Sequence, residues 1–191
     1  EISLGLVGSE MCIRDSGYLY LGTNRGLYYT SYPVKLNGDL PDIHPIPQSS
    51  GQVWNLCKIG SDLFCLHDRG IFQIKGIGMR RITDITGAWY CQEVVGHPDR
   101  MFVGVYNGIY LLEKKAGEWR VLCKVDGFID SCRLFEQESA KVLWVYNSGS
   151  IIRLELSDDL TRQVSMKFYG MAEGFPAVSY THLRAHETEA D

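Results

Sequence analysis

The sequence lacks most of the features that mark membrane proteins, metalloproteins and nucleotide-dependent enzymes. It contains no run of about 18 apolar residues, the length that an α-helix needs to cross a bilayer. It has six cysteines but no Cys-x-x-Cys pair, which argues against a zinc ribbon. It has no phosphate-binding loop, no Gly-x-Gly-x-x-Gly and no Gly-x-Ser-x-Gly. Neither a membrane span nor a catalytic residue is therefore predicted in this segment.

Both ends of the chain resemble the translated adapter DNA of a transposon-based sequencing library. One choice of codons for 6–16 has a reverse complement that encodes 178–187. Two unrelated protein segments have no reason to be complementary strands of one DNA. We therefore interpret 1–16 and 178–191 as non-native segments and exclude them from fold reasoning. The native domain is expected to occupy 17–177.

The charge of the chain comes from these ends. They hold two of the 19 basic and six of the 23 acidic residues, so 17–177 carries 17 of each. A neutral segment of this kind offers no basic face for nucleic acid or for an anionic membrane. We expect no nucleic-acid contact by this segment.

Four similar stretches recur along 17–177, and each has apolar and aromatic residues on both sides of a short polar turn. They read LYLGTNRGLYY, LFCLHDRGIFQ, MFVGVYNGIYL and LWVYNSGSIIR. The turn position falls at Gly26, Gly70, Gly108 and Ser150, at intervals of 44, 38 and 42 residues. A period near 40 with hairpins is typical of propeller blades. Because Gly149 precedes Ser150, the fourth turn is expected to be shifted by one residue.

Two further strands are predicted in each unit. Strands at 53–59, 88–94 and 131–137 precede hairpins, and strands at 80–86, 118–125 and 162–170 follow them. The prolines in 39–47 suit only an edge strand or a loop. The fold class is therefore all-β, a partial β-propeller of about four blades of four antiparallel strands, with the first blade cut before its innermost strand. The outer faces of the first and last blades are expected to be exposed in this segment and to pack against the missing blades of the same polypeptide.

The remaining chemistry has structural explanations. The five cysteines of the native segment lie in apolar stretches, where cysteine acts as a small hydrophobe, and their odd number argues against a closed disulfide framework. His44, His67 and His97 share no metal-ligand spacing, and Asp158-Asp159 reads as a solvated turn. No metal, cofactor or catalytic site is predicted.

A family resemblance covers almost all of this segment. YLGTNRGLYY, QVWNLCKIGSDLFCLHDRGIF, TGAWYCQEV, LWVYNSGSIIRLEL and FYGMAEGFP resemble the two-component regulator propeller family of bacterial sensor and transcription regulators. The resemblance implies a periplasmic ligand-sensing propeller. It also implies a following β-sandwich domain, a membrane helix and a histidine kinase or helix-turn-helix output module on the same polypeptide.

Ligand-binding candidates lie where one propeller face would form. Hairpin turns and the starts of innermost strands share that face, which gathers Trp54, Trp89, Asn24, Arg25, Asp68, Arg69, Tyr106 and Asn107. Aromatic planes, a guanidinium and amides suit a carbohydrate, glycan-derived or small anionic ligand. The alternative is that both tryptophans fill the wedge between blades and the polar residues only form turns.

Three functions remain open at this point. The first is a non-enzymatic ligand-sensing propeller fragment of an extracytoplasmic signalling receptor. The second is a protein–protein interaction propeller that docks a partner segment on the same face. The third is a propeller hydrolase or lyase whose catalytic blades lie outside this segment.

Overall fold

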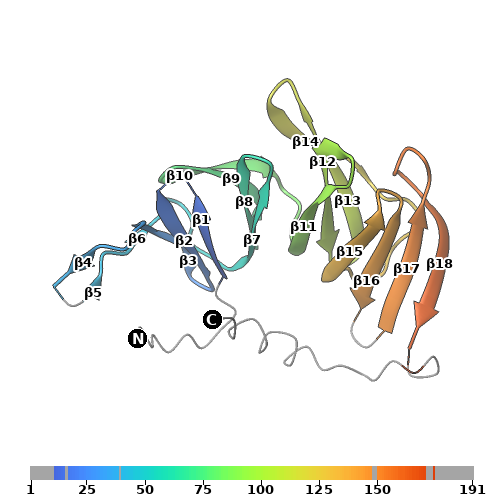
Figure 1. Ribbon diagram of the computed structural model, residues 1–191, viewed down its shortest axis with the longest axis horizontal. Helices are drawn as coiled ribbons and strands as arrows, with labels where there is room; N and C mark the ends of the chain where they lie inside the picture. The colour runs from blue at the N-terminus through green and yellow to red at the C-terminus, as the bar shows by residue number, and fades with distance from the viewer. Residues whose placement is uncertain (1–10, 16, 39, 148–149, 171–173, 175–191) are drawn as a thin grey trace.

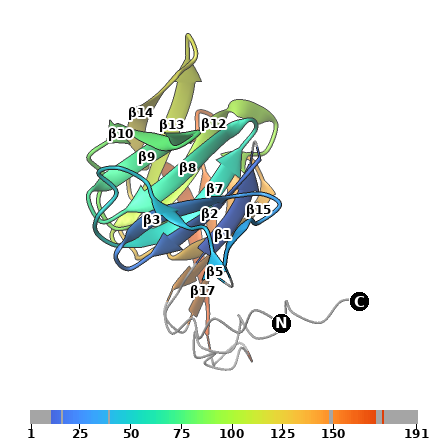
Figure 2. The ribbon, with the colours of Figure 1, turned by 90° about the vertical axis from the view of Figure 1, so that its left-hand side faces the viewer.

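The computed structural model describes residues 11–15, 17–38, 40–147, 150–170 and 174. Within these residues the chain forms β-structure and no helix, and four four-stranded antiparallel sheets follow one another along the sequence (Figure 1). A view from the N-terminal sheet shows the sheets lying one behind another (Figure 2). The all-β, partial propeller-like fold predicted from the repeat is confirmed.

We name the four sheets blades 1 to 4. Blade 1 contains β1 (Met11–Asp15), β2 (Tyr18–Thr23), β3 (Gly26–Ser31) and β6 (His44–Pro45). Blade 2 contains β7 (Val53–Ile59), β8 (Asp62–His67), β9 (Gly70–Lys75) and β10 (Gly78–Thr83). Blade 3 contains β11 (Ala88–Val94), β12 (His97–Val105), β13 (Gly108–Lys115) and β14 (Glu118–Lys124). Blade 4 contains β15 (Leu134–Ser139), β16 (Val142–Asn147), β17 (Ser150–Leu156) and β18 (Gln163–Tyr169).

The central hairpin has the same register in every blade. Gly26, Gly70 and Gly108 open the third strand with φ values of 145°, 132° and 140°, which favour glycine. A Cβ on Gly70 would lie 2.3 Å from the Thr83 carbonyl oxygen, so the neighbouring backbone also requires glycine there. Ser150 pairs with Asn147 as Gly108 pairs with Val105. The predicted one-residue shift of the fourth turn is therefore wrong, because serine accepts the same register.

Blade 1 differs from the others at both of its edges. Its first strand, β1, pairs with β2 from Met11–Gly22 to Asp15–Tyr18, so the innermost strand that the sequence analysis found missing is supplied by 11–15. The hydrogen bonds between paired strands use backbone atoms, so β1 can pair with β2 even though we interpret 1–16 as non-native. At the other edge β6 is a two-residue strand, and β4 (Leu36–Asn37) and β5 (Leu40–Pro41) form a separate hairpin. This short, proline-containing edge agrees with the expectation for 39–47.

The core lies between successive sheets. Phe102, Phe135 and Val145 are no more than 1% exposed and pack blade 3 on blade 4. Equivalent apolar clusters join blade 2 to blade 3 and blade 1 to blade 2. Blade 2 is therefore buried on both faces, and β8 is buried from Leu63 to His67 without interruption. Continuous burial of this kind explains why its strands read as apolar runs.

A disulfide joins the innermost strands of blades 2 and 3. Cys57 of β7 and Cys91 of β11 are bonded, with a Cα–Cα distance of 6.5 Å. The expectation that all five cysteines are unpaired core residues is therefore wrong for this pair. An odd number of cysteines does not exclude a single disulfide. Here the equivalent innermost strands of two neighbouring blades bring one pair of cysteines together. Cys65 and Cys132 are free and buried, as expected.

Blades 2 and 3 are tied a second time by Asp62 at the start of β8. One carboxylate oxygen accepts hydrogen bonds from Lys114 Nζ at 2.6 Å and Trp119 Nε1 at 2.7 Å, both in blade 3. The other accepts one from Gln73 Nε2 at 2.9 Å. Burial alone raises the pKa of Asp62, but the hydrogen bonds from Lys114 and Trp119 outweigh it, so the pKa lies below its usual value of 3.8. The ionised Asp62 carboxylate thus links blade 2 to blade 3 through an ion pair and a hydrogen bond.

Candidate functional site

A hollow of about 410 Å³ opens between blades 2 and 3. Four segments contribute to it, and they are the start of β7, the β8–β9 turn, the segment before β11 and the β12–β13 turn. Its lining consists of Trp54, Asp68, Thr86, Gly87, Tyr106 and Asn107. The volume falls in the range of roughly 300–1,000 Å³ that is usual for small-molecule sites.

An aromatic cluster forms one side of this hollow. The Trp54 and Trp89 rings lie 4.5 Å apart between centroids, and Tyr106 meets Trp89 edge to face at 5.1 Å. Asn55 Nδ2 donates a hydrogen bond to the Trp89 carbonyl oxygen at 3.0 Å, which joins the starts of β7 and β11. Within the described residues, the buried indole nitrogens of Trp54 and Trp89 have no hydrogen-bond partner. The two tryptophans therefore fill the wedge between blades, and Trp54 also lines the hollow.

Gly87 sets the position of the tyrosine. Its φ is +69°, and a Cβ at this position would lie 2.4 Å from Cδ2 of Tyr106. Only glycine lets the Tyr106 ring lie against this backbone. Tyr106 is 49% exposed, so the rest of its ring faces outward. The Thr86-Gly87 dipeptide thus shapes the hollow, although the sequence analysis did not select it.

Asp68 is the charged residue of the hollow. Its backbone N–H donates to the Gln52 carbonyl oxygen at 2.9 Å, and its side chain, 42% exposed, contacts His67 Nδ1. His67 is fully buried, and its Nε2 lies 3.2 Å from the Ser49 carbonyl oxygen. Burial lowers the pKa of His67 below its usual 6.5, and this effect outweighs the opposing contacts with Ser49 and Asp68. His67 is the group in contact with the Asp68 carboxylate, and no Lys or Arg among the described residues forms an ion pair with that carboxylate.

The hollow brings together four of the eight residues selected from the sequence, namely Trp54, Asp68, Tyr106 and Asn107. Trp89 lies in contact with two of them without lining the space. The remaining three, Asn24, Arg25 and Arg69, do not line it. Arg69 donates a hydrogen bond from Nη2 to the Gln48 carbonyl oxygen at 2.6 Å. Asn24 and Arg25 are exposed in the blade 1 turn, where Thr23 Oγ1 accepts from the Arg25 N–H at 3.0 Å.

A second hollow of about 380 Å³ adjoins the first one. The two share Thr86 and Asn107, and the second is completed by Thr83, Asp84, Ile85 and Tyr110. Asp84 is paired there with Arg81 at 2.8 Å. One end of the combined space is thus aromatic, and the other is lined mainly by hydroxyl, amide and carboxylate groups.

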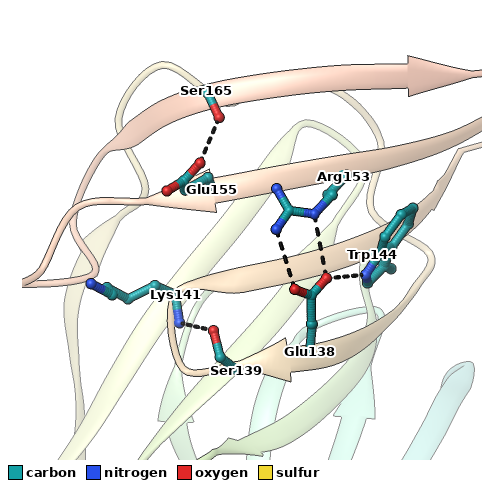
Figure 3. A network of polar contacts seen from close by, with 7 residues as sticks. All are labelled: Glu138, Ser139, Lys141, Trp144, Arg153, Glu155 and Ser165. Atoms are coloured by element: carbon teal, nitrogen blue, oxygen red, sulfur yellow. Dashed lines mark hydrogen bonds and ion pairs between the residues drawn. The ribbon is translucent and has the colours of Figure 1, made fainter.

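The outer face of blade 4 carries the other notable polar cluster (Figure 3). Glu138 accepts hydrogen bonds from Arg153 Nη2 at 3.2 Å and from Trp144 Nε1 at 2.8 Å. The hydrogen bonds from Arg153 and Trp144 lower the pKa of Glu138. Trp144 lies 5.5 Å from the Tyr169 ring. These groups satisfy one another on a sheet face, and none of them lines either of the two hollows described above.

The other polar residues singled out in the sequence lie apart from the hollows. His44 lies 3.1 Å from the Asp42 carboxylate in the blade 1 edge, and His97 is exposed at the start of β12. Asp158 pairs with Lys141 at 2.8 Å, and Asp159 accepts a hydrogen bond from Ser157 that lowers its pKa to about 2. In the part of the chain that the structure describes, no three His, Cys, Asp or Glu residues are grouped to hold a metal ion.

The fold and the hollow together define a repeat β-protein with a small-ligand-sized space between two blades. The sequence matches no protein-family model and no curated protein. Within the described residues there is also no helix long and apolar enough to cross a membrane.

Proposed function

We propose that this chain is a segment of an extracytoplasmic ligand-sensing propeller of a bacterial signal-transduction regulator. The observation that carries the proposal is the hollow between blades 2 and 3, where Trp54, Asp68 and the Tyr106-Asn107 pair converge from three separate segments. The hollow is of a size that is usual for small-molecule sites and has both aromatic and polar groups in its lining. The family resemblance of the sequence supports the regulator assignment, and the further blades and output module are part of the same proposal.

The disulfide supports the proposed periplasmic location. Disulfides form and persist in oxidising compartments and are rare in the cytosol of most bacteria. Cys57–Cys91 links two blades next to the proposed binding face. The function requires no cofactor and no catalytic residue, because occupancy of the hollow is the signal.

Ligand binding can be tested by tryptophan fluorescence on the full 191-residue chain. The ligands are a panel of neutral mono- and disaccharides, small carboxylates and small alkylammonium compounds. We expect at least one class to change the emission saturably, and Trp54→Leu to weaken its binding about tenfold or more. Trp144→Leu is the matched control, because Trp144 lies on blade 4 outside the hollow. Failure of every class to bind would refute ligand sensing by this face.

An interaction propeller is the second candidate. Val164 and Phe168 on the last strand of blade 4 are 60% and 48% exposed, and β18 is the edge of its sheet. An exposed edge of this kind can accept a partner strand. This alternative predicts that Phe168→Ser abolishes capture of a partner and leaves small-ligand binding unchanged.

A further inference from the structure

The charged side chain that lines the hollow belongs to an acid, Asp68, and not to either of the arginines selected from the sequence. An anionic ligand was an attractive hypothesis because Arg25 and Arg69 stand in the hairpin turns. The structure places neither arginine in the lining, and Asp68 is the one charged side chain among the described lining residues. No described Lys or Arg forms an ion pair with Asp68, whose side chain contacts the His67 ring. The charged group that the hollow presents to a ligand is therefore a carboxylate.

The aromatic rings of the hollow add a second attraction for positive charge. The face of an indole or phenol ring carries negative electrostatic potential and binds ammonium or guanidinium groups. The same cluster shows this property within the protein, because Arg133 Cζ lies 5.0 Å from the Trp89 ring centroid. Trp54 and Tyr106 line the hollow, and no described Lys or Arg lies over either ring. No described cation of the protein therefore competes with a ligand for these two rings.

We propose that the hollow binds a small organic cation, an alkylammonium compound that also carries a hydrogen-bonding group. The ammonium group lies against Trp54 and Tyr106 with Asp68 as its counter-charge. The hydrogen-bonding group extends toward Thr86 and Asn107, which line both hollows. This inference rests on the proposed ligand-sensing function and specifies its ligand class.

A quaternary ammonium group fits this environment better than a sugar or a carboxylate. A carboxylate would lie beside Asp68 and be repelled by it. A neutral sugar would donate hydroxyl hydrogen bonds to the Asp68 carboxylate but would bring it no counter-charge. A methylated ammonium makes van der Waals contact with the rings and neutralises the carboxylate at the same time.

The decisive comparison is between choline and its uncharged isostere 3,3-dimethylbutan-1-ol, which have the same shape. Binding of each to the full chain is measured by isothermal titration calorimetry and by tryptophan fluorescence. We expect choline to bind about tenfold more tightly than the isostere, or better, since a desolvated cation–π contact and an ion pair are both lost in the neutral compound. This comparison needs no variant and so does not depend on the folding of a mutant.

Two variants locate the site. Asp68→Asn should weaken choline binding about tenfold and leave the isostere unaffected, and Asn107→Asp should strengthen choline binding by adding a second carboxylate. Asp158→Asn, at an exposed carboxylate of blade 4, is the matched control and should change neither affinity.

Each outcome separates this inference from the proposed function. Equal affinities for choline and the isostere, or binding of sugars or carboxylates without binding of choline, would overturn the organic-cation proposal and leave ligand sensing in place. If choline bound more tightly than the isostere but Asp68→Asn had no effect, the ligand would lie elsewhere and the assignment to this hollow would fail. If no compound of the panel bound, the ligand-sensing function itself would fail.

Discussion

Opening the Cys57–Cys91 disulfide should lower the free energy of unfolding by about 4 kcal/mol. The bond joins residues that are 34 positions apart. Constraining a loop of that size removes roughly 12–13 cal/mol/K of entropy from the unfolded chain, which is about 3.8 kcal/mol at 25 °C. For a chain of this length each kcal/mol changes Tm by about 2–4 °C, so Tm should fall by about 8–15 °C. The loss is large compared with the usual stability of a domain, about 5–15 kcal/mol.

The assay is guanidinium unfolding followed by tryptophan fluorescence, with and without a phosphine reductant. The double variant Cys57→Ser/Cys91→Ser is the control, and the reductant should not change its transition. Peptide mapping of the unreduced protein should recover Cys57 and Cys91 in one linked peptide. Recovery of both as free thiols would refute the pairing. Coincident transitions of the mapped, linked protein and its reduced form would refute the loop argument.

Three further predictions concern the contacts between blades. Asp62→Asn should lower the free energy of unfolding by about 2 kcal/mol, because the Lys114 charge loses its partner. Because the folded pKa of Asp62 is lowered, its stabilisation should be complete above the ordinary value of 3.8 and decline as pH falls further, as pH-dependent denaturation of the wild type against Asp62→Asn would show. Gly104→Ala places a Cβ 2.4 Å from the Cys132 carbonyl oxygen and should cost about 1–3 kcal/mol, whereas Gly78→Ala, with only a 3.8 Å contact, should be nearly neutral by the same denaturation assay. Cys132, fully buried with its thiol pKa raised by burial, should resist iodoacetamide until denaturant is added, and rapid native labelling would contradict its position.

The repeat made most of the fold predictable. Predicted strands 53–59 and 88–94 coincide with β7 and β11, because each has strong aromatic and branched content and ends at a glycine or turn. The strand predicted at 131–137 begins three residues later, at Leu134. Its first residues instead connect blades, and the Cys132 N–H donates to the Val105 carbonyl oxygen at 2.9 Å. Local propensity cannot identify such a contact with a different sheet.

The candidate site was predictable in place but not in composition. Turns at equivalent positions of a repeat meet on one face, so Trp54, Asp68 and Tyr106 could be selected without coordinates. The direction of a long exposed side chain depends on its nearest acceptor, and for Arg69 this is the Gln48 carbonyl oxygen. The role of Gly87 depends on a ring 19 residues away in sequence and has no local signal beyond the glycine itself.

The double tie between blades 2 and 3 limits how binding in the hollow could be transmitted. Asp62 stands at the beginning of β8 and Asp68 just beyond its end, so the ion pair fastens the side remote from the hollow while the disulfide fastens the innermost strands. The disulfide and the ion pair hold blades 2 and 3 together, so we expect that a bound molecule does not separate these two sheets. Any movement would therefore fall at the joints on either side, which the described residues close by apolar packing and hydrogen bonds rather than by a disulfide.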